Sequence, residues 1–245
     1  MSPMLTIAKR EFRSYFDSPL AYVVICLSFL GLGLMFFLLN GGFWQLDRAS
    51  VARLFDYAPV GLSLLVVPVV TMRLVAEERR SGTLEMLITL PVKDSDVIVG
   101  KYLGALGLVL VLVLATIAYP LTMFWRPWNL GPLDTGPVFS GYVGLVLFSA
   151  AAVAVGLLVS SFVESQAVAF FVTVASLGAL WWFGDLAEAA GSGWPAATLR
   201  YISFQTRLNG FERGLVDSRD VVFFVSVALL CLIVSFRALE RRKWA

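Results

Sequence analysis

Six long hydrophobic segments restrict this chain to a fold inside a membrane. They lie at residues 20–39, 57–76, 102–124, 138–163, 167–184 and 221–236. A helix of about 20 mostly apolar residues crosses the hydrocarbon core of a bilayer, which is about 30 Å thick. Arg73 is the only charged residue within these segments, and it lies close enough to one end to reach the interface. We therefore predict an all-α membrane protein with six transmembrane helices, forming a single domain over residues 1–245.

The composition agrees with a membrane protein and excludes several functions. Of the 245 residues, 59% are apolar and 15% are charged, whereas soluble domains have about 45–50% and about 25%. The net charge of +2 provides no basic face for a nucleic acid, so no nucleic-acid partner is expected. Histidine is absent, which removes the commonest general base and the commonest metal ligand. Cys26 and Cys231 each lie inside a hydrophobic segment and are expected to pack as small apolar residues.

The chain also lacks a phosphate-binding loop of the G-x-x-x-x-G-K-[ST] type. Its Gly100-Lys101 pair is followed by Tyr102 and has Ser95 where the pattern requires the first glycine. We therefore expect no ATP site, no other cofactor, no metal and no catalytic site in this chain. If ATP drives its activity, another chain must bind the nucleotide.

Residues 3–17 are predicted to form an amphipathic helix before the first segment. Its apolar face would carry Leu5, Ala8, Phe12, Tyr15 and Phe16. Its polar face would carry Lys9, Arg10, Arg13 and Asp17. A basic helix with an aromatic face, placed directly before a transmembrane segment, is expected to lie on membrane lipid with its apolar side down.

The loop at residues 77–101 is predicted to contain a further short helix. Gly82 and Pro91 are expected to bound a helix over residues 83–90. One face of that helix would carry Leu84, Leu87 and Ile88. An amphipathic helix held between two membrane segments is suited to a groove on a partner protein.

The distribution of basic residues predicts the orientation of the chain. Twelve Lys and Arg residues fall on the side of the N-terminus, of the loop at residues 77–101 and of the C-terminus, against seven on the other side. Basic residues concentrate on the cytoplasmic side of membrane proteins. Both termini are therefore predicted to be cytoplasmic, which requires an even number of crossings.

Packing between helices is expected where small residues repeat. The fourth segment carries Ala152, Gly156 and Ser160 four residues apart, so that a neighbouring helix can approach closely. Hydroxyl groups on the third and fifth segments are expected to bond within their own helix or to a neighbour rather than to a substrate. These are Thr116, Tyr119, Thr122, Thr173 and Ser176.

Four stretches of the chain carry a resemblance to a known family. The pattern E-E-R-x-x-G-T-L-E-x-L, followed by P-V and then G-K, spans residues 77–101 and resembles the loop of type-2 ABC transporter permeases, the exporter-type membrane subunits. Residues 15–22, YFDSPLAY, are similar to the N-terminal pattern of the permeases linked to gliding motility. Residues 211–220 and the closing residues 239–244 also resemble that subfamily. The permease that serves nitrous-oxide-reductase maturation is similar too.

The resemblance implies a half-transporter in a bacterial inner membrane. The N-terminal helix would be an elbow helix, with Lys9, Arg10, Phe12, Arg13 and Phe16 as its characteristic residues. The loop helix would be a coupling helix that docks on a cytosolic ABC ATPase. The residues implied in this coupling are Glu77, Glu78, Gly82, Thr83, Leu84, Glu85, Leu87, Ile88 and Pro91. Two permease subunits, identical or different, would pair above two ATPases, and short re-entrant helices are implied within residues 185–220.

Other interpretations remain open at this point. Glu77 and Glu78 either contact the partner or form a solvated turn balanced by Arg79 and Arg80. The chain could be a scaffold that anchors an envelope machine without transporting anything. An ion-coupled secondary transporter is disfavoured because such proteins need ionisable groups within the membrane. A membrane enzyme is the weakest alternative, because no catalytic set of residues is present.

Overall fold

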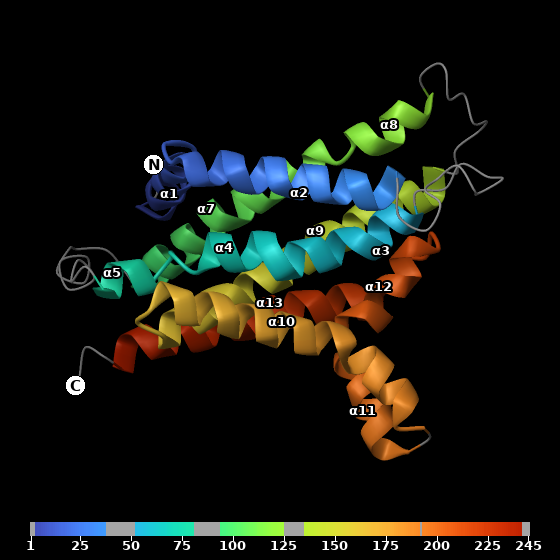
Figure 1. The fold of residues 1–245 in the computed structure, drawn as a ribbon. Helices are drawn as coiled ribbons and strands as arrows, with labels where there is room; N and C mark the ends of the chain where they lie inside the picture. The colour runs from blue at the N-terminus through green and yellow to red at the C-terminus, as the bar shows by residue number, and fades with distance from the viewer. Residues whose placement is uncertain (1–2, 38–51, 81–93, 125–134, 192, 242–245) are drawn as a thin grey trace.

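The structure, a computed structural model, describes residues 3–37, 52–80, 94–124, 135–191 and 193–241. In these ranges the chain is almost entirely helical and contains no β-strand. The helices run along one another as an elongated bundle, with α1, α5 and the last turns of α13 at one end (Figure 1). The opposite end holds α3, α8, α11 and α12 (Figure 1). We call the first of these the α5 end.

Within the described ranges, five helical segments are long and apolar enough to cross a membrane. They are Leu54–Glu78, Asp94–Thr122, Thr135–Phe162, Gln166–Ala189 and Ser218–Glu240. The helices α1 (Pro3–Phe16) and α2 (Pro19–Phe37) form a pair bent by 71°, which gives a sixth crossing if the pair is counted as one span. The prediction of an all-α protein with several membrane helices is therefore confirmed at this level for the described residues.

The second membrane segment is built from several pieces. Its helices are α3 (Ala52–Gly61), the π-helical turn η3 (Leu62–Val66), α4 (Val67–Thr71) and α5 (Ala76–Arg80). The π turn ends directly before the first turn of α4, where Pro68 lies. Proline has no N–H for the regular hydrogen bond to the preceding turn, so the helix changes its winding there. A second break separates α4 from α5 at residues 72–75.

The third segment is interrupted where a proline removes one of its hydrogen bonds. It consists of α7 (Asp94–Ala115) and α8 (Ala118–Phe124). Pro120 cannot donate to the carbonyl of Thr116, which instead accepts from the Tyr119 N–H at 3.0 Å. The helix begins at Asp94, well before the apolar run that starts at residue 102, so Lys101 lies inside it.

The helix α9 (Thr135–Phe162) forms the centre of the bundle. It contacts α7, α4, α10 (Gln166–Ala189), α12 (Phe204–Glu212) and α13 (Ser218–Arg241). Its membrane segment is 67% buried inside the chain, against 33% for α10 and 22% for α13. Much of the surface of α10 and α13 therefore remains for lipid or another protein to cover.

The connection between the fifth and sixth segments contains two short helices, in the part of the chain where the family resemblance implies them. They are α11 (Trp194–Ile202) and α12, and α11 projects away from the bundle (Figure 1). Three buried aromatic rings anchor α12 to the core: Phe204 packs edge-on against Phe148 and Phe224 at centroid distances of 5.7 and 5.5 Å. Near its end, the Phe211 carbonyl accepts a hydrogen bond from the Ser140 hydroxyl at 2.6 Å.

Candidate functional site

A buried ionic cluster joins three helices at the α5 end. The Lys101 ammonium on α7 donates to Glu11 Oε1 on α1 at 3.0 Å and to Glu78 Oε1 on α5 at 2.7 Å. The Lys101 side chain is only 3% exposed, and the two glutamates are 14% and 19% exposed. A buried ammonium is costly unless it is paired and hydrogen-bonded, so it holds both carboxylates in place. We call these three residues the Lys101 cluster.

Two glycines of α7 allow α1 to approach closely enough to form this cluster. A β-carbon at Gly100 would collide with Ile7, and one at Gly104 would collide with Glu11 and the backbone of α1. The two glycines lie four residues apart on one face of α7, the spacing at which small residues bring helices into contact. The α1 face that was expected to rest on lipid therefore rests partly on α7.

A second contact ties α1 to the broken second segment. The Tyr15 hydroxyl donates to the Val70 carbonyl at 2.9 Å, and the Tyr15 side chain is buried. Burial raises the pKa of Tyr15 above its usual range, so its phenol stays protonated and remains a donor. This bond satisfies the Val70 carbonyl at the break after α4, where the Leu74 N–H donates to the Thr71 carbonyl instead of to Val70.

The small residues of α9 pack against the break between α4 and α5. Ser160 Oγ accepts hydrogen bonds from the backbone N–H groups of Val75 and Ala76, both at 3.2 Å. Val75 is the last residue before α5 and Ala76 is its first, so their amides have no carbonyl partner within that helix. A β-carbon at Gly156 would overlap the Thr71 side chain, and Ala152 is fully buried. In this strip, therefore, Ser160 acts as a helix cap as well as a small packing residue.

Glu77 and Glu78 point to different partners. Glu78 belongs to the Lys101 cluster, whereas Glu77 accepts from the Arg73 guanidinium at 3.0 Å on a more exposed surface. The remaining residues expected to contact an ATPase lie outside the described residues. They are Gly82, Thr83, Leu84, Glu85, Leu87, Ile88 and Pro91.

The basic and aromatic residues of α1 occupy different surroundings. Lys9, Arg10 and Arg13 are exposed, and Arg10 pairs with Glu11 at 3.4 Å. The Phe12 and Phe16 rings lie against each other with their centroids 5.1 Å apart. The exposed cations leave the outer face of α1 available to solvent or anionic groups.

Sequence reasoning missed two members of the Lys101 cluster. Lys101 was read as part of a loop, and Glu11 was not considered at all, because its partner lies 90 residues away. The Gly100-x-x-x-Gly104 spacing directly around Lys101 was the available signal, since it marks a close helix contact.

The hydroxyl groups expected to bond within the bundle do so. Thr116, Thr122, Thr173 and Ser176 each donate to a carbonyl of their own helix. The Tyr119 hydroxyl donates to the Phe29 carbonyl of α2. In the described parts of the chain, no group of three or more His, Cys, Asp and Glu residues is arranged to hold a metal ion.

In a comparison with known protein families, one family model matches most of the length of the chain. The sequence model described as "ABC-2 family transporter protein" matches residues 54–236, which begin in α3 and end in α13. The matched region contains Lys101 and Glu78, whereas Glu11 lies before it. A comparison with curated proteins gave no match.

Proposed function

Because this chain belongs to the ABC-2 family of transporter membrane proteins, we propose that it is the permease subunit of an ATP-driven ABC exporter. A separate cytosolic ATPase would hydrolyse ATP, and this chain would turn that work into substrate translocation or mechanical work across the membrane. The family match over residues 54–236 carries the proposal. The Lys101 cluster supports it, because it provides a mechanical connection at the end of the bundle where a partner would act.

The proposed route of force begins at the loop that follows α5. Residues 83–90 would form the coupling helix, with Leu84, Leu87 and Ile88 in a groove of the ATPase. A push on this loop would reach α5 directly, because α5 ends where the loop begins. From α5 it would pass through Glu78 to Lys101 on α7 and to Glu11 on α1. Packed elements that are joined by buried polar contacts move together rather than bending smoothly.

The proposed assembly contains two copies of the ATPase and a second permease, identical or different. The weakly buried surfaces of α10 and α13 leave room for such a partner as well as for lipid. The elbow helix would be α1, the termini would face the cytoplasm of a bacterium, and the membrane would be the inner one. Residues 15–22, 211–220 and 239–244 favour the gliding-motility subfamily within the ABC-2 family.

Co-purification from the native host tests the proposal. A tagged chain is expected to bring down an ABC ATPase in equal amount. The double substitution Leu84→Asp and Leu87→Asp should release that ATPase by placing two carboxylates in an apolar groove, while the permease remains in the membrane fraction.

A matched variant controls for the added charge. Leu215 and Val216 are 66% and 51% exposed near the other end of the bundle, and replacing both with Asp should leave the ATPase bound. Retention of the ATPase at full stoichiometry by the Leu84→Asp, Leu87→Asp variant would show that this loop is not the docking element.

A further inference from the structure

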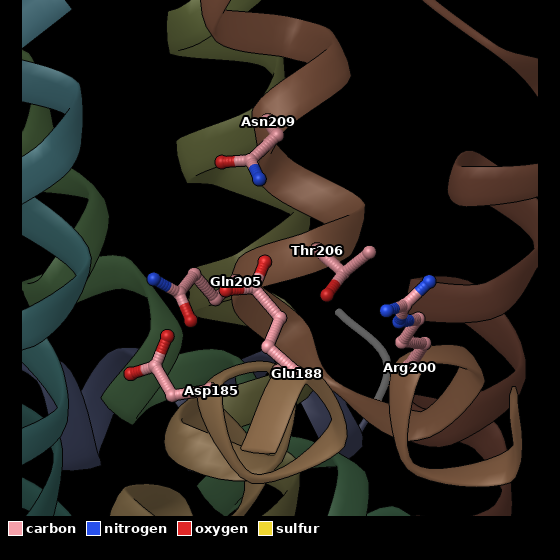
Figure 2. Close-up of a pocket in the computed structure, with 7 residues that line it drawn as sticks. Asp185, Glu188, Arg200, Gln205, Thr206 and Asn209 are labelled. Atoms are coloured by element: carbon pink, nitrogen blue, oxygen red, sulfur yellow. The ribbon is translucent and has the colours of Figure 1, made fainter. Parts of the chain in front are cut away.

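A polar cavity of about 260 Å³ lies at the end of the bundle opposite to α5. It is formed where the end of α10 meets α11 and the first turns of α12. Six polar side chains line it: Asp185, Glu188, Arg200, Gln205, Thr206 and Asn209. In Figure 2, Arg200 lies across the cavity from Asp185 and Gln205, with Thr206 and Glu188 between them. The cavity can hold several water molecules or one small polar group.

The shape of the cavity depends on a glycine at its base. A β-carbon at Gly184 would come within 3.0 Å of Gln205 Oε1 and of the Ser203 hydroxyl, and within 3.1 Å of the Thr206 hydroxyl. Glycine at this position therefore lets the polar residues at the start of α12 lie directly against α10. The Ser203 hydroxyl is already engaged, because it donates to the Trp181 carbonyl and accepts from the Thr206 N–H.

The three charged groups of the cavity have no partner within the described chain. Neither an ion pair nor a side-chain hydrogen bond there involves Asp185, Glu188 or Arg200. By contrast, the nearby Arg207 pairs with Asp220 at 2.9 Å and stacks on the Tyr201 ring. All three residues are exposed, and their two carboxylates and one guanidinium line the same cavity, where they are accessible to a ligand from outside.

The position of the cavity matches the level of a lipid head group. Asp185 is the first charged residue after the apolar run of α10, and Trp181 and Trp182 lie one turn before it. Trp194, which begins α11, is 84% exposed, and Tyr201 is 63% exposed. Exposed Trp and Tyr residues gather at membrane–water interfaces, where head groups lie.

We propose that this cavity binds a zwitterionic amine–phosphate group, the chemistry of a phosphoethanolamine head. The primary ammonium would donate to the carboxylates of Asp185 and Glu188. The phosphate would accept from the Arg200 guanidinium, whose planar fork matches phosphate oxygens. Gln205 and Asn209 offer amide donors and acceptors to the remaining atoms of the group. The assignment does not depend on the proposed partnership with an ATPase.

Lipid titration of the purified full-length chain tests this site. The protein in detergent is titrated with phosphatidylethanolamine, phosphatidylcholine and phosphatidylglycerol of identical acyl chains, and bound lipid is counted by native mass spectrometry. Phosphatidylcholine has a cation without N–H donors, and phosphatidylglycerol has no cation. Phosphatidylethanolamine is expected to bind about tenfold more tightly than either, the effect of one charge-assisted hydrogen bond. Equal binding of the three lipids would overturn the proposal.

Substitutions then assign the two halves of the site. Asp185→Asn with Glu188→Gln should lower the affinity for phosphatidylethanolamine about tenfold without lowering that for phosphatidylglycerol. Arg200→Gln should weaken both lipids, because both carry a phosphate. Arg219→Gln removes an exposed cation from the start of α13 at the same end and should change neither affinity. If the carboxylate double variant folds and retains full preference for phosphatidylethanolamine, the ammonium site is wrong.

Competition with soluble glycerophosphoethanolamine identifies the source of the group. Displacement of the bound lipid by this compound supports a site that recognises the head group alone, from lipid or from solution. Failure to displace, together with selective binding of the diacyl lipid, supports a lipid site. Binding of neither form would overturn the proposal even if every variant misfolds, because this comparison uses the natural sequence.

Discussion

At the scale of single residues, Lys101 stands out in the described part of the α5 end because its charged group is buried. Its side chain is nearly inaccessible, and its ammonium holds two carboxylates from other helices. The two glutamate side chains are 14% and 19% exposed, although the Oε2 atom of Glu78 is itself buried. The arrangement is stable because the ammonium and both carboxylates are present together, and removal of the cation leaves two anions side by side.

Replacement of Lys101 by methionine is predicted to destabilise the protein by about 3 kcal/mol, the lower end of the range for breaking a buried ion pair. Unfolding in mixed detergent, followed by circular dichroism, measures this change. Lys9→Met removes an exposed cation of α1 and should change stability by less than about 0.5 kcal/mol. Adding Glu78→Gln to Lys101→Met should restore part of the loss. Equal stability of the Lys101→Met and Lys9→Met variants would contradict the role given to the cluster.

The Lys101 cluster also shows what a sequence can and cannot reveal. Each apolar segment consists of residues that are contiguous in the sequence, so the sequence alone predicts a membrane protein. The depth of Lys101 could not, because it depends on α7 beginning at Asp94 and on partners 90 and 23 residues away. Ser160 was recognised as small, but its two hydrogen bonds required knowledge of where α4 breaks. Pairings between distant segments are set by packing, which no local pattern encodes.

At the scale of elements, the start of α5 depends on a side chain of α9. Ser160→Ala would leave the Val75 and Ala76 amides without their acceptor. We predict a loss of about 1–3 kcal/mol in the free energy of unfolding, the cost of unsatisfied buried donors. Ser149→Ala is the matched control, because the Ser149 hydroxyl is buried in the same helix and has no hydrogen-bond partner in the described structure. That control should be neutral or slightly stabilising; a loss equal to that of Ser160→Ala would argue against the cap.

The opposite end of the bundle contains a second element contact, which is sensitive to pH. Glu212, at the end of α12, forms a side-chain hydrogen bond with Asp56 of α3. Burial, followed by the charge and hydrogen bond of Asp56, raises the pKa of Glu212 to about 7, and the neighbouring Arg213 opposes this shift. The folded chain therefore keeps this proton over a pH range in which the unfolded chain releases it.

The free energy of unfolding is accordingly predicted to fall as the pH rises from about 4.5 to about 7. Above that range the Glu212 proton no longer stabilises the folded chain. The expected change is about 1–2 kcal/mol, because solvent screening reduces the full linkage value. Glu212→Gln keeps an amide donor for Asp56 and should remove this pH dependence. Asp217→Asn, at an exposed residue near the same end, keeps the side-chain acceptor for the Arg219 N–H and should retain the pH dependence. Unfolding at pH 4.5, 6 and 7.5 measures the slope, and a Glu212→Gln slope equal to that of the natural chain would refute the assignment.

At the scale of the whole molecule, the described ends of the chain lie together. The beginning of α1 and the end of α13 are at the α5 end, whereas α11 and α12 are at the other (Figure 1). With both ends on one side of a membrane the number of crossings is even, and counting the bent pair of α1 and α2 as one span would bring the five candidate segments to six. The 71° bend places α1 across the bundle axis while α2 runs along it.

Labelling of single cysteines from each side of the membrane tests this topology. The natural Cys26 and Cys231 are first replaced by alanine, and one cysteine is then placed at Glu85, Lys243 or Leu215. Because basic residues concentrate on the side of the loop and termini, cysteines at positions 85 and 243 are expected to react only when the reagent reaches the cytoplasm. The cysteine at position 215, in the connection after α12, should react with an impermeant maleimide added outside.

The pattern of labelling separates two kinds of failure. If positions 85 and 243 react from opposite sides, the number of crossings between them is odd. The assignment of four membrane crossings after α5 would then be wrong. If both react from outside and position 215 reacts from inside, the bundle is correct but inverted. An inverted bundle would place the loop after α5 beyond the reach of any cytosolic ATPase, because a motor can push only on a surface that it contacts.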